Sequence, residues 1–409
     1  MADLVSIDEA RRRVLSCVRP LPVEEVPLDE ARGRVLAEDL TSAIDLPPFD
    51  GSAMDGYAVI AGAAAELELI GESRAGSPSQ AALRPGKAIR ISTGAALPEG
   101  ATAVVALEQA EPAAPAARER ASEAPASGEG RVRVPATSAG ENVRPAGEVL
   151  RAGQLVLAAG APLDPAALGV AAAVGCACLR CARRPRVALV VTGDELTPPG
   201  EPLRPGGIYS SNAQALSAQV AAAGGELVLN ETARDTPRST GELLARALDT
   251  ADVVLSSGGI SVGAHDHVKP ALEALGVRER FWGVSLRPGK PTWFGSRDGV
   301  LVFGLPGNPV SAMVTFELFV RPALKALQGA NAEAVTAPAT LAGPVARHPQ
   351  REQAVRVRLQ HTDNGLSAVA TGAQGSHMLT SMLGADGLAR IPAGRGELAA
   401  GARVEVELL

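Results

Sequence analysis

The spacing of apolar residues predicts an α/β region in the second half of the chain. Between residues 185 and 328, four short apolar runs of β type, RVALVV, GELVLN, ADVVLSS and GVLVFGL, alternate with segments of helical spacing. The helices are expected to begin near Ser211, Pro237, His267 and Pro309. Such alternation is typical of a parallel sheet with crossover helices.

The N-terminal part of the chain has helical spacing in three places. SIDE at residues 6–9 has the form of a capping box and precedes a periodic apolar run. A second helix is predicted over 27–40. A third is predicted over 163–175, with Asp164 as its cap and Pro165 as its first helical residue.

Two further parts have β-type spacing. From about 50 to 145, the short runs KAIRIS, ATAVVALE and GRVRVP are separated by Gly and Pro, which predicts a β-rich domain inserted into the helical N-terminal part. From 335 to 409, AVRVRLQ, LSAVAT and ARVEVELL alternate at period two and predict a small separate β domain. Residues 111–130 are of low complexity and are expected to form a loop.

Composition narrows the class of protein. A chain of 409 residues is too long for one core and predicts two to four domains. The net charge of −6 and the aromatic content of 2% argue against a nucleic-acid partner. No stretch is apolar enough to span a bilayer and the start has no secretory pattern, so we expect a cytoplasmic protein without a membrane partner.

Three cysteines cluster in CACLRC, at Cys176, Cys178 and Cys181. A metal site would need another ligand, and no His or Cys lies nearby in the sequence. Cys176 and Cys178 alternate as small strand residues do, so we expect reduced cysteines that pack in a core.

Four loops follow the strands of the α/β region, at the edge where ligands collect in open parallel sheets. Three of them bring carboxylates, and two bring glycine-rich turns; the loops are TGDEL (192–196), ARDTP (233–237), SSGGISVGAHDHVK (256–269) and LPGNPVS (305–311). LRPGKP adds Arg287 and Lys290 just before the last strand. Carboxylates beside free amides and cations are what a magnesium–phosphate ligand requires.

Each loop also has a simpler interpretation. Asn308 suits an N-cap and Pro309 a first helical position, so the last loop is an anion site or a plain strand-to-helix corner. In the simpler interpretation, Asp194 and Glu195 are solvated carboxylates of a surface loop, and Asp235 caps the helix that follows. His265 and His267 flank Asp266, but no third histidine is near to complete a metal site.

Two motifs outside this region carry similar side chains. FDGSAMDGYA at 49–58 places Asp50 and Asp55 on a glycine-punctuated segment, and ISTGAALPEGATAVV places Ser92 and Thr93 at the end of a short strand. Turn chemistry in a β domain would explain both equally well.

Seven segments resemble one known family, and they occur in the family's order. They are PFDGSAMDGYA, STGAALPEGATAVV, GENVRPAGE, RPRVALVVTGDEL, SSGGISVGAHDHVK, LRPGKP and GLPGNPVSA. The family is that of the MoeA-type molybdopterin molybdenumtransferases, which is related to the E domain of gephyrin. GSHMLTSMLGADGLARIP resembles the family's C-terminal domain, so the likeness covers nearly the whole chain apart from residues 111–130.

The resemblance implies a multidomain α/β plus β protein. The implied parts are an N-terminal helical domain (1–49 and 146–180), an inserted β-rich domain (50–145), a parallel-sheet α/β domain that binds molybdopterin (181–330) and a small C-terminal β-barrel (331–409). The implied reaction is Mg²⁺-dependent cleavage of adenylylated molybdopterin (molybdopterin-AMP), coupled to molybdate insertion, with release of molybdenum cofactor and AMP. The resemblance also implies a homodimer whose cleft lies between subunits, and it makes the molybdopterin adenylyltransferase a candidate partner.

The resemblance assigns roles to individual residues as well. Asp55, Thr93, Glu195, Asp235 and Asp266 are the expected catalytic residues. Glu195 and Asp266 are the expected Mg²⁺ ligands, or they position the attacking water. Substrate, phosphate and molybdate oxygens are expected to contact Ser257, Gly258, Gly259, Ser261, Gly263, Arg287, Lys290, Pro306, Gly307, Asn308, Pro309 and Ser311.

One position departs from the family's pattern. Where the family usually has GED, this chain has Gly147-Glu148-Val149, which removes a carboxylate expected near the cleft. That change would weaken activity or alter the affinity for molybdate. Two other functions stay open: a non-catalytic scaffold of the gephyrin kind, and another adenylyl- or pyrophosphate-processing enzyme on the same α/β domain. The retained carboxylates favour the transferase over the scaffold, and the presence of DGSAMDGYA and of the C-terminal segment favours it over the other adenylyl- or pyrophosphate-processing enzymes.

Overall fold

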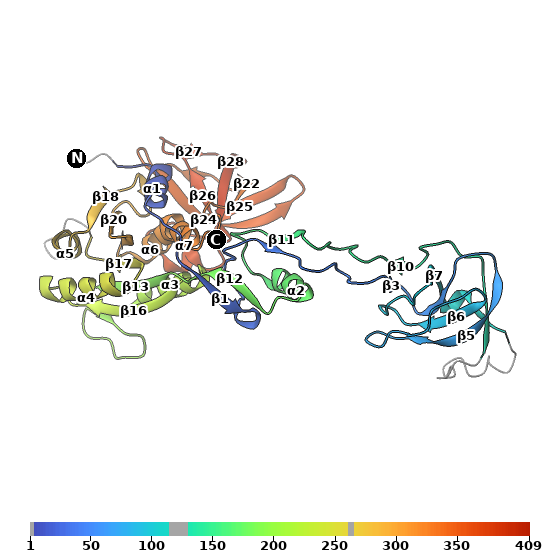
Figure 1. Cartoon of the computed structure of the whole chain (residues 1–409). Coiled ribbons are helices and arrows are strands. Elements are labelled where there is room, and N and C mark those ends of the chain that lie inside the picture. The colour runs from blue at the N-terminus through green and yellow to red at the C-terminus, as the bar shows by residue number, and fades with distance from the viewer. Residues whose placement is uncertain (1–3, 114–129, 261–265) are drawn as a thin grey trace. The chain divides into compact units, whose positions relative to one another are not determined.

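The computed structural model describes residues 4–113, 130–260 and 266–409 (Figure 1). The chain divides into two compact units. Unit 1 consists of Met1–Glu38, Ala159–Asp164 and Cys178–Leu409, and unit 2 consists of Asp39–Ala158 and Pro165–Ala177. Most of the predicted loop 111–130 lies outside the described residues. In the described part, no helix is long and apolar enough to cross a membrane.

Unit 1 contains a six-stranded sheet in the order β16-β13-β17-β21-β20-β18. Its strands are β13 (Arg186–Thr192), β16 (Glu226–Ala233), β17 (Val253–Ser257), β18 (Arg278–Trp282), β20 (Trp293–Arg297) and β21 (Val300–Leu305). β16, β13, β17 and β21 are parallel, and β20 and β18 complete the sheet in antiparallel fashion. The four predicted strands of the α/β region are therefore confirmed. β13, β17 and β21 are buried along nearly their whole length, as strands covered on both faces must be.

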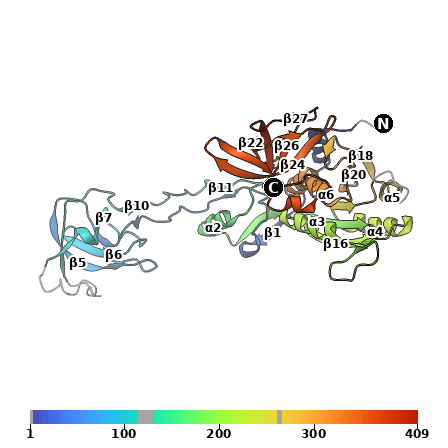
Figure 2. The ribbon, with the colours of Figure 1, turned by 180° about the vertical axis from the view of Figure 1, so that it is seen from behind.

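Helices cover both faces of this sheet (Figure 2). They begin at or next to the predicted residues and are α3 (Ser211–Ala222), α4 (Pro237–Thr250), α5 (Val268–Ala274) and α6 (Pro309–Thr315). α6 continues through a π-helical turn, Phe316–Val320, into α7 (Arg321–Leu327). Leu255 of β17 lies in the core formed with α3, α6 and α7, whereas its neighbour Val254 lies in the core formed with α4 and α5.

The first predicted helix is confirmed as α1 (Ile7–Leu15). The Ser6 side chain caps it by accepting a hydrogen bond from the Glu9 N–H at 3.1 Å. The buried residues of α1 join the core that α3, α6 and α7 form on the sheet.

The helix predicted over 27–40 is wrong. The chain forms β1 (Val23–Pro27), a short 3₁₀ turn at Leu28–Glu30, and then Gly33 with a φ of 72°, which interrupts any helix. β1 pairs with β12 (Cys178–Ala182), and further on the Leu36 N–H donates to the Ala161 carbonyl at 2.9 Å. This long-range pairing outweighs the local helical spacing.

β12 holds two of the three clustered cysteines. Cys181 is fully buried, and burial raises the pKa of its thiol, which agrees with a reduced packing residue. Cys178 is exposed, so the packing prediction is wrong for it, and Cys176 lies before the strand rather than within it. All four cysteines of the chain are free thiols.

The C-terminal part of unit 1 forms a closed barrel of five strands, which confirms the predicted small β domain (Figure 2). The barrel strands are β22 (Thr336–Leu341), β24 (Glu352–Thr362), β25 (Gly365–Ala370), β26 (Gly387–Ile391) and β28 (Arg403–Leu408). Closure comes from β24, which pairs with β25 on one side and β26 on the other. β19 (Leu286–Arg287), from the α/β region, pairs with the start of β24. β23 (Val345–Ala346) pairs with β27 (Glu397–Leu398) beside the barrel.

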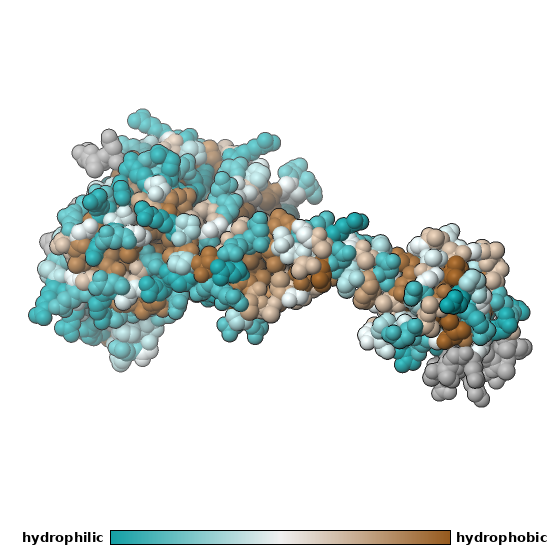
Figure 3. Space-filling model, in the orientation of Figure 1, coloured by the Kyte–Doolittle hydropathy of each residue, from teal (hydrophilic) through white to brown (hydrophobic). Residues whose placement is uncertain are grey.

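Unit 2 contains a second six-stranded sheet, in the order β7-β4-β6-β5-β9-β8. Its strands are β4 (Gly56–Val59), β5 (Ala65–Ser73), β6 (Lys87–Ile91), β7 (Ala103–Ala106), β8 (Glu111–Pro112) and β9 (Arg131–Val134). Two short pairs, β3 (Gly51–Ser52) with β10 (Val143–Arg144) and β2 (Leu40–Thr41) with β11 (Leu155–Leu157), and the predicted helix α2 (Pro165–Ala173) complete the unit. Phe49, Met54 and Val149 are exposed, and Figure 3 shows hydrophobic residues on the visible face of the β-rich sheet.

Candidate functional site

The predicted site residues of unit 1 cluster at one edge of the parallel sheet. β13 ends at Thr192, β17 at Ser257 and β21 at Leu305, and the carboxyl ends of parallel strands share an edge. β20 runs the other way, and its first residue, Trp293, pairs with Gly304 near the end of β21. Lys290 precedes Trp293 by three residues, so the sheet places it at this same edge.

The loops after β13 and β16 are tied together by two aspartates. The Asp194 N–H donates to Asp235 Oδ2 at 3.1 Å, and the Asp235 N–H donates to Asp194 Oδ1 at 3.2 Å. Asp235 does not cap α4, because Thr236 takes that position and accepts from the Ser239 N–H. The two carboxylates therefore meet at the edge of the sheet.

Glu195 lies back over its own loop. A Cβ atom built on Gly193, which has a φ of 146°, would lie 2.7 Å from Glu195 Oε2. The carboxylate thus occupies space that only a glycine leaves open. Asp266 is half-buried and stands directly before the N-terminus of α5. Among the described residues, no group of three or more His, Cys, Asp or Glu side chains is arranged to hold a metal ion.

The glycines of the third loop lie against Thr192. A Cβ on Gly258 would approach Thr192 Oγ1 to 2.7 Å, and one on Gly259 would approach it to 3.0 Å. Both glycines have positive φ, 92° and 66°, so the loop requires glycine for its backbone and for its packing. Two other predicted residues, Ser261 and Gly263, lie outside the described residues.

The fourth loop packs on the third. The Gly258 N–H donates to the Leu305 carbonyl at 3.2 Å, and a Cβ on Gly307 would lie 3.6 Å from Gly258 Cα. Pro309 is the first residue of α6 as predicted, but the Asn308 side chain makes no capping hydrogen bond, so that part of the prediction is wrong. Pro306 and Ser311 are buried, while Gly307 and Asn308 are exposed.

The predicted basic residues are exposed, and one of them joins a larger cluster. Arg287 faces His348 and Arg351, and Arg351 Nη2 lies 2.8 Å from His348 Nε2. Burial and the charge of Arg287 lower the pKa of the Arg351 guanidinium. Burial, together with Arg351 and Arg287, also lowers the pKa of His348. No carboxylate of the described residues forms an ion pair with Arg287 or Arg351, so this cluster is suited to bind an anion.

Two residues near this edge were missed by the sequence analysis. Asn212, at the start of α3, is buried and donates to Ser257 Oγ and to the Gly307 carbonyl, at 2.8 Å each. Arg356 of β24 is fully buried, and burial lowers its pKa to about 10. Its partners in the described part are uncharged: Ser381 Oγ and the carbonyls of Ala354 and Gly375. The sequence offered no signal for Asn212, which stands in the polar stretch SSNAQ, and Arg356 looked like an alternating residue of a strand.

In unit 2, the predicted residues Asp55 and Thr93 are in contact. Asp55 Oδ1 accepts a hydrogen bond from the Thr93 N–H at 2.8 Å, and both residues are exposed. Asp50 Oδ1 likewise accepts from the Ala146 N–H at 2.7 Å. The Asp50 contact joins segments 96 positions apart, so it is not local turn chemistry, and each aspartate uses only its Oδ1 in these two contacts.

Comparison with known protein families gives matches over nearly the whole chain. Residues 5–175 match the family model described as "MoeA N-terminal region (domain I and II)", 188–326 match "Probable molybdopterin binding domain", and 338–409 match "MoeA C-terminal region (domain IV)". The chain belongs to the MoeA family.

Individual MoeA relatives are similar over their full lengths. "Molybdopterin molybdenumtransferase 2" of Mycobacterium tuberculosis is 36% identical over 98% of each chain. The molybdopterin molybdenumtransferase of Haemophilus influenzae is 33% identical over 99% of this chain and 98% of its own. A crystal structure of a molybdopterin biosynthesis MoeA protein from Pyrococcus horikosii superposes with a TM-score of 0.81 at 34% identity, covering 99% of both chains. The predicted fold class is therefore confirmed as MoeA-like.

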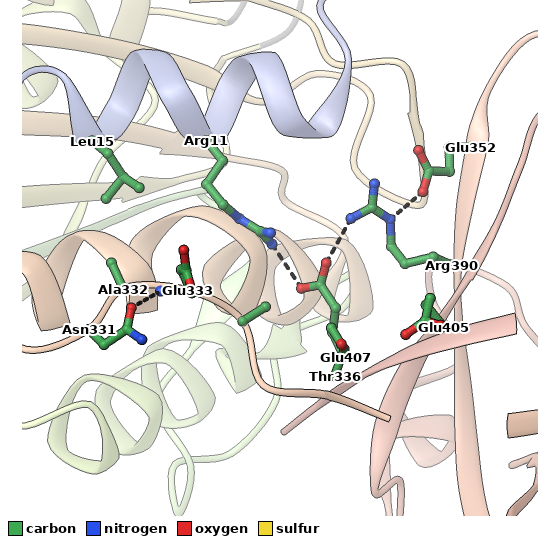
Figure 4. A pocket seen from close by; sticks show the side chains of 11 residues that line it. Arg11, Leu15, Asn331, Ala332, Glu333, Thr336, Glu352, Arg390, Glu405 and Glu407 are labelled. Carbon is green, nitrogen blue, oxygen red and sulfur yellow. Dashed lines mark hydrogen bonds and ion pairs between the residues drawn. The ribbon is translucent and has the colours of Figure 1, made fainter. Parts of the chain in front are cut away.

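A surface pocket elsewhere in unit 1 has a different character from the MoeA strand-end loops. It has a volume of about 610 Å³ and lies between α1, residues 331–336 and the barrel. Figure 4 shows Arg11 and Arg390 pointing toward Glu407, at 2.8 and 2.7 Å, while Arg390 also pairs with Glu352. None of the predicted site residues lines this pocket. Its charged network joins α1 to the barrel and is a structural feature.

Proposed function

We propose that this protein inserts molybdate into adenylylated molybdopterin and releases molybdenum cofactor and AMP. Membership of the MoeA family makes it an enzyme of molybdenum cofactor biosynthesis. The observation that carries the finer proposal is the edge of the parallel sheet that Lys290 shares, where the first loop is tied to the second and the third loop to the fourth. Acids, exposed amides and a cation along one edge are the groups that a nucleotide-linked pterin requires.

The roles of the individual residues follow from their chemistry. Gly259, Gly307 and Asn308 would present their amides to anionic oxygens, whereas the Gly258 N–H already donates to the Leu305 carbonyl. Arg287 and Lys290 would neutralise phosphate or molybdate charge, and Arg351 adds a second guanidinium beside Arg287. Asp235 holds the Asp194 loop in place. Ser311, Pro306 and Pro309 shape the fourth loop.

Magnesium is part of this proposal. Mg²⁺ in nucleotide enzymes is commonly held by one or two carboxylates together with substrate phosphates and waters. In that mode, Glu195 and Asp266 would hold the ion. When bound, the ion would neutralise charge that develops on the phosphate. The alternative role proposed for Glu195 and Asp266 is to position the attacking water.

The assembly is also a proposal. We infer a cytoplasmic homodimer that receives its substrate from the molybdopterin adenylyltransferase. Asp55 and Thr93 are the unit 2 residues proposed to take part in catalysis, because their contact leaves one Asp55 oxygen available. Size-exclusion chromatography with light scattering tests the dimer, and a monomer mass at working concentration would overturn it.

The test of function is direct. Purified protein is incubated with adenylylated molybdopterin, Mg²⁺ and molybdate, and AMP and active cofactor are measured. We expect Glu195→Gln and Asp266→Asn to lower AMP release at least tenfold. Glu242→Gln is the matched control, because Glu242 is an exposed carboxylate on α4 that pairs with Arg238. Wild-type protein that binds the substrate without releasing AMP would instead indicate a scaffold.

A further inference from the structure

Asn212 connects the third and fourth loops from a position on α3. One N–H of its amide donates to Ser257 Oγ and the other to the Gly307 carbonyl, at 2.8 Å each. The Ser257 hydroxyl in turn donates to the Pro306 carbonyl at 3.4 Å. Two successive carbonyls of the fourth loop, those of Pro306 and Gly307, therefore point toward α3 and β17.

The direction of these carbonyls fixes the direction of two amides. In a trans peptide, the C=O of one residue and the N–H of the next point to opposite sides. The peptides after Pro306 and Gly307 are trans, so the N–H groups of Gly307 and Asn308 point away from Asn212. Both residues are exposed, and neither N–H donates to any residue that the structure describes.

We propose that Asn212 is a positioning residue for the reaction: it holds the Pro306–Gly307 backbone so that the Gly307 and Asn308 amides together bind one anionic oxygen of the substrate. This inference rests on the proposed function, which supplies an anionic substrate for this edge. Asn212 touches no reacting atom itself. It acts through the two peptide units that it orients.

The pairing of Asn212 supports a role beyond packing. The side chain is 8% exposed, and its Oδ1 has no hydrogen-bond partner among the described residues. Turning the amide over would place this oxygen against the Gly307 carbonyl, so the carbonyl fixes the orientation observed.

The experiment compares two buried amides. Asn212→Leu keeps a similar volume but removes both donors, and Asn212→Ala is a smaller second variant in case the leucine does not fit. Gln328→Leu is the matched control: Gln328 is 3% exposed and donates to the carbonyls of Ala223 and Leu324, at 3.2 and 2.9 Å. It belongs to the same unit but to none of the strand-end loops. Melting temperature establishes that each variant is folded.

Two readouts are measured for each protein. The first is the Kd of adenylylated molybdopterin without molybdate, from the fluorescence of the pterin, and the second is steady-state AMP release. We expect either Asn212 variant to raise Kd and KM at least tenfold with a smaller change in kcat, because the amides bind an oxygen that the substrate already carries. Gln328→Leu should leave Kd and KM within twofold of the wild type.

Each outcome decides the matter. Equal Kd values for the Asn212 and Gln328 variants would overturn the positioning role. Wild-type binding without AMP release would overturn the proposed function, while the ratio of Kd values would still decide the role of Asn212. Wild-type protein that neither binds adenylylated molybdopterin nor releases AMP would overturn both the proposed function and the role of Asn212.

Discussion

Asp194 and Asp235 each accept a hydrogen bond from the backbone N–H of the other, at 3.1 and 3.2 Å. The two residues come from loops 41 positions apart in the chain. Their exchange joins the end of β13 to the end of β16, the edge strand of the sheet. The loop that carries Glu195 is thereby anchored on the side away from the glycine-rich loops.

This reciprocal pair predicts non-additive effects. Asp194→Ala and Asp235→Ala should each increase amide hydrogen exchange in both loops, and the double variant should be little worse than either single one. The coupling energy should be about 0.5–1.5 kcal/mol in AMP-release kinetics, since both groups are at the surface. Fully additive losses would show that the two loops act independently.

Gly258 should not tolerate a side chain. Gly258→Ala places a Cβ 2.7 Å from Thr192 Oγ1 and 3.0 Å from the Thr192 carbonyl oxygen, at a φ of 92°. We expect a loss of about 2 kcal/mol or more in the free energy of unfolding, measured in urea. Gly307→Ala is the control for stability, because its Cβ meets nothing closer than 3.6 Å, and it should lose less than about 1 kcal/mol.

His348 should make stability depend on pH on the acid side of neutrality. Burial, Arg351 and Arg287 lower its pKa in the folded state, so the unfolded chain takes up a proton more readily. The contribution of neutral His348 is present above the unfolded pKa of about 6.5 and is lost as pH falls through it toward the folded value. Between pH 7 and pH 5, the melting temperature of the His348→Gln variant should therefore fall less than that of the wild type. Equal decreases in melting temperature for the two proteins would contradict a role of His348 in this pH dependence.

Glu407 should be required for docking of α1 on the barrel. It pairs with Arg11 at 2.8 Å and with Arg390 at 2.7 Å. The Glu407 side chain is 7% exposed, and the Arg390 side chain is 17% exposed. Burial opposes the charge of Arg390, but Glu352 and Glu407 outweigh it and raise its pKa. Glu407→Gln should cost about 2–4 kcal/mol in urea unfolding, whereas Glu405→Gln, an exposed neighbour on β28, should cost less than about 0.5 kcal/mol.

Val149→Asp tests the departure from the family's GED pattern. Val149 is 66% exposed, so the change should leave the free energy of unfolding within about 0.5 kcal/mol. If the missing carboxylate matters, the variant should change the molybdate concentration that gives half-maximal AMP release. An unchanged molybdate dependence would show that the position has no role in this chain.

The sequence was most informative where periodicity and strand ends coincide. The strands and helices of the α/β region follow from apolar runs bounded by Gly and Pro, because both faces of this sheet are buried. The helix expected over 27–40 failed because its apolar residues serve pairing with segments more than a hundred positions away, which no local window detects.

The loops of the site could be predicted from the sequence, but the buried residues that hold these loops in place could not. Asp194, Glu195 and Lys290 lie in motifs that follow or precede strands, and topology alone brings them to one edge. Asn212 gave no such signal, since it stands in an ordinary helix start and its partners come from two other loops. Arg356 looked like an alternating strand residue, but it lies on the face of β24 opposite to Val355 and Val357, outside the barrel core, where it contacts Gly375 and Ser381.

The pairing of β19 with β24 has a consequence for how this enzyme is divided in experiments. Arg287 belongs to a two-residue strand whose hydrogen-bonded neighbour, Glu352–Gln353, lies in the barrel. A fragment that stops after α7 would retain every strand-end loop and still lose the ladder that fixes Arg287. Dissecting the chain at its apparent module boundary would thus detach a guanidinium from its scaffold, and fragment assays would underestimate anion affinity.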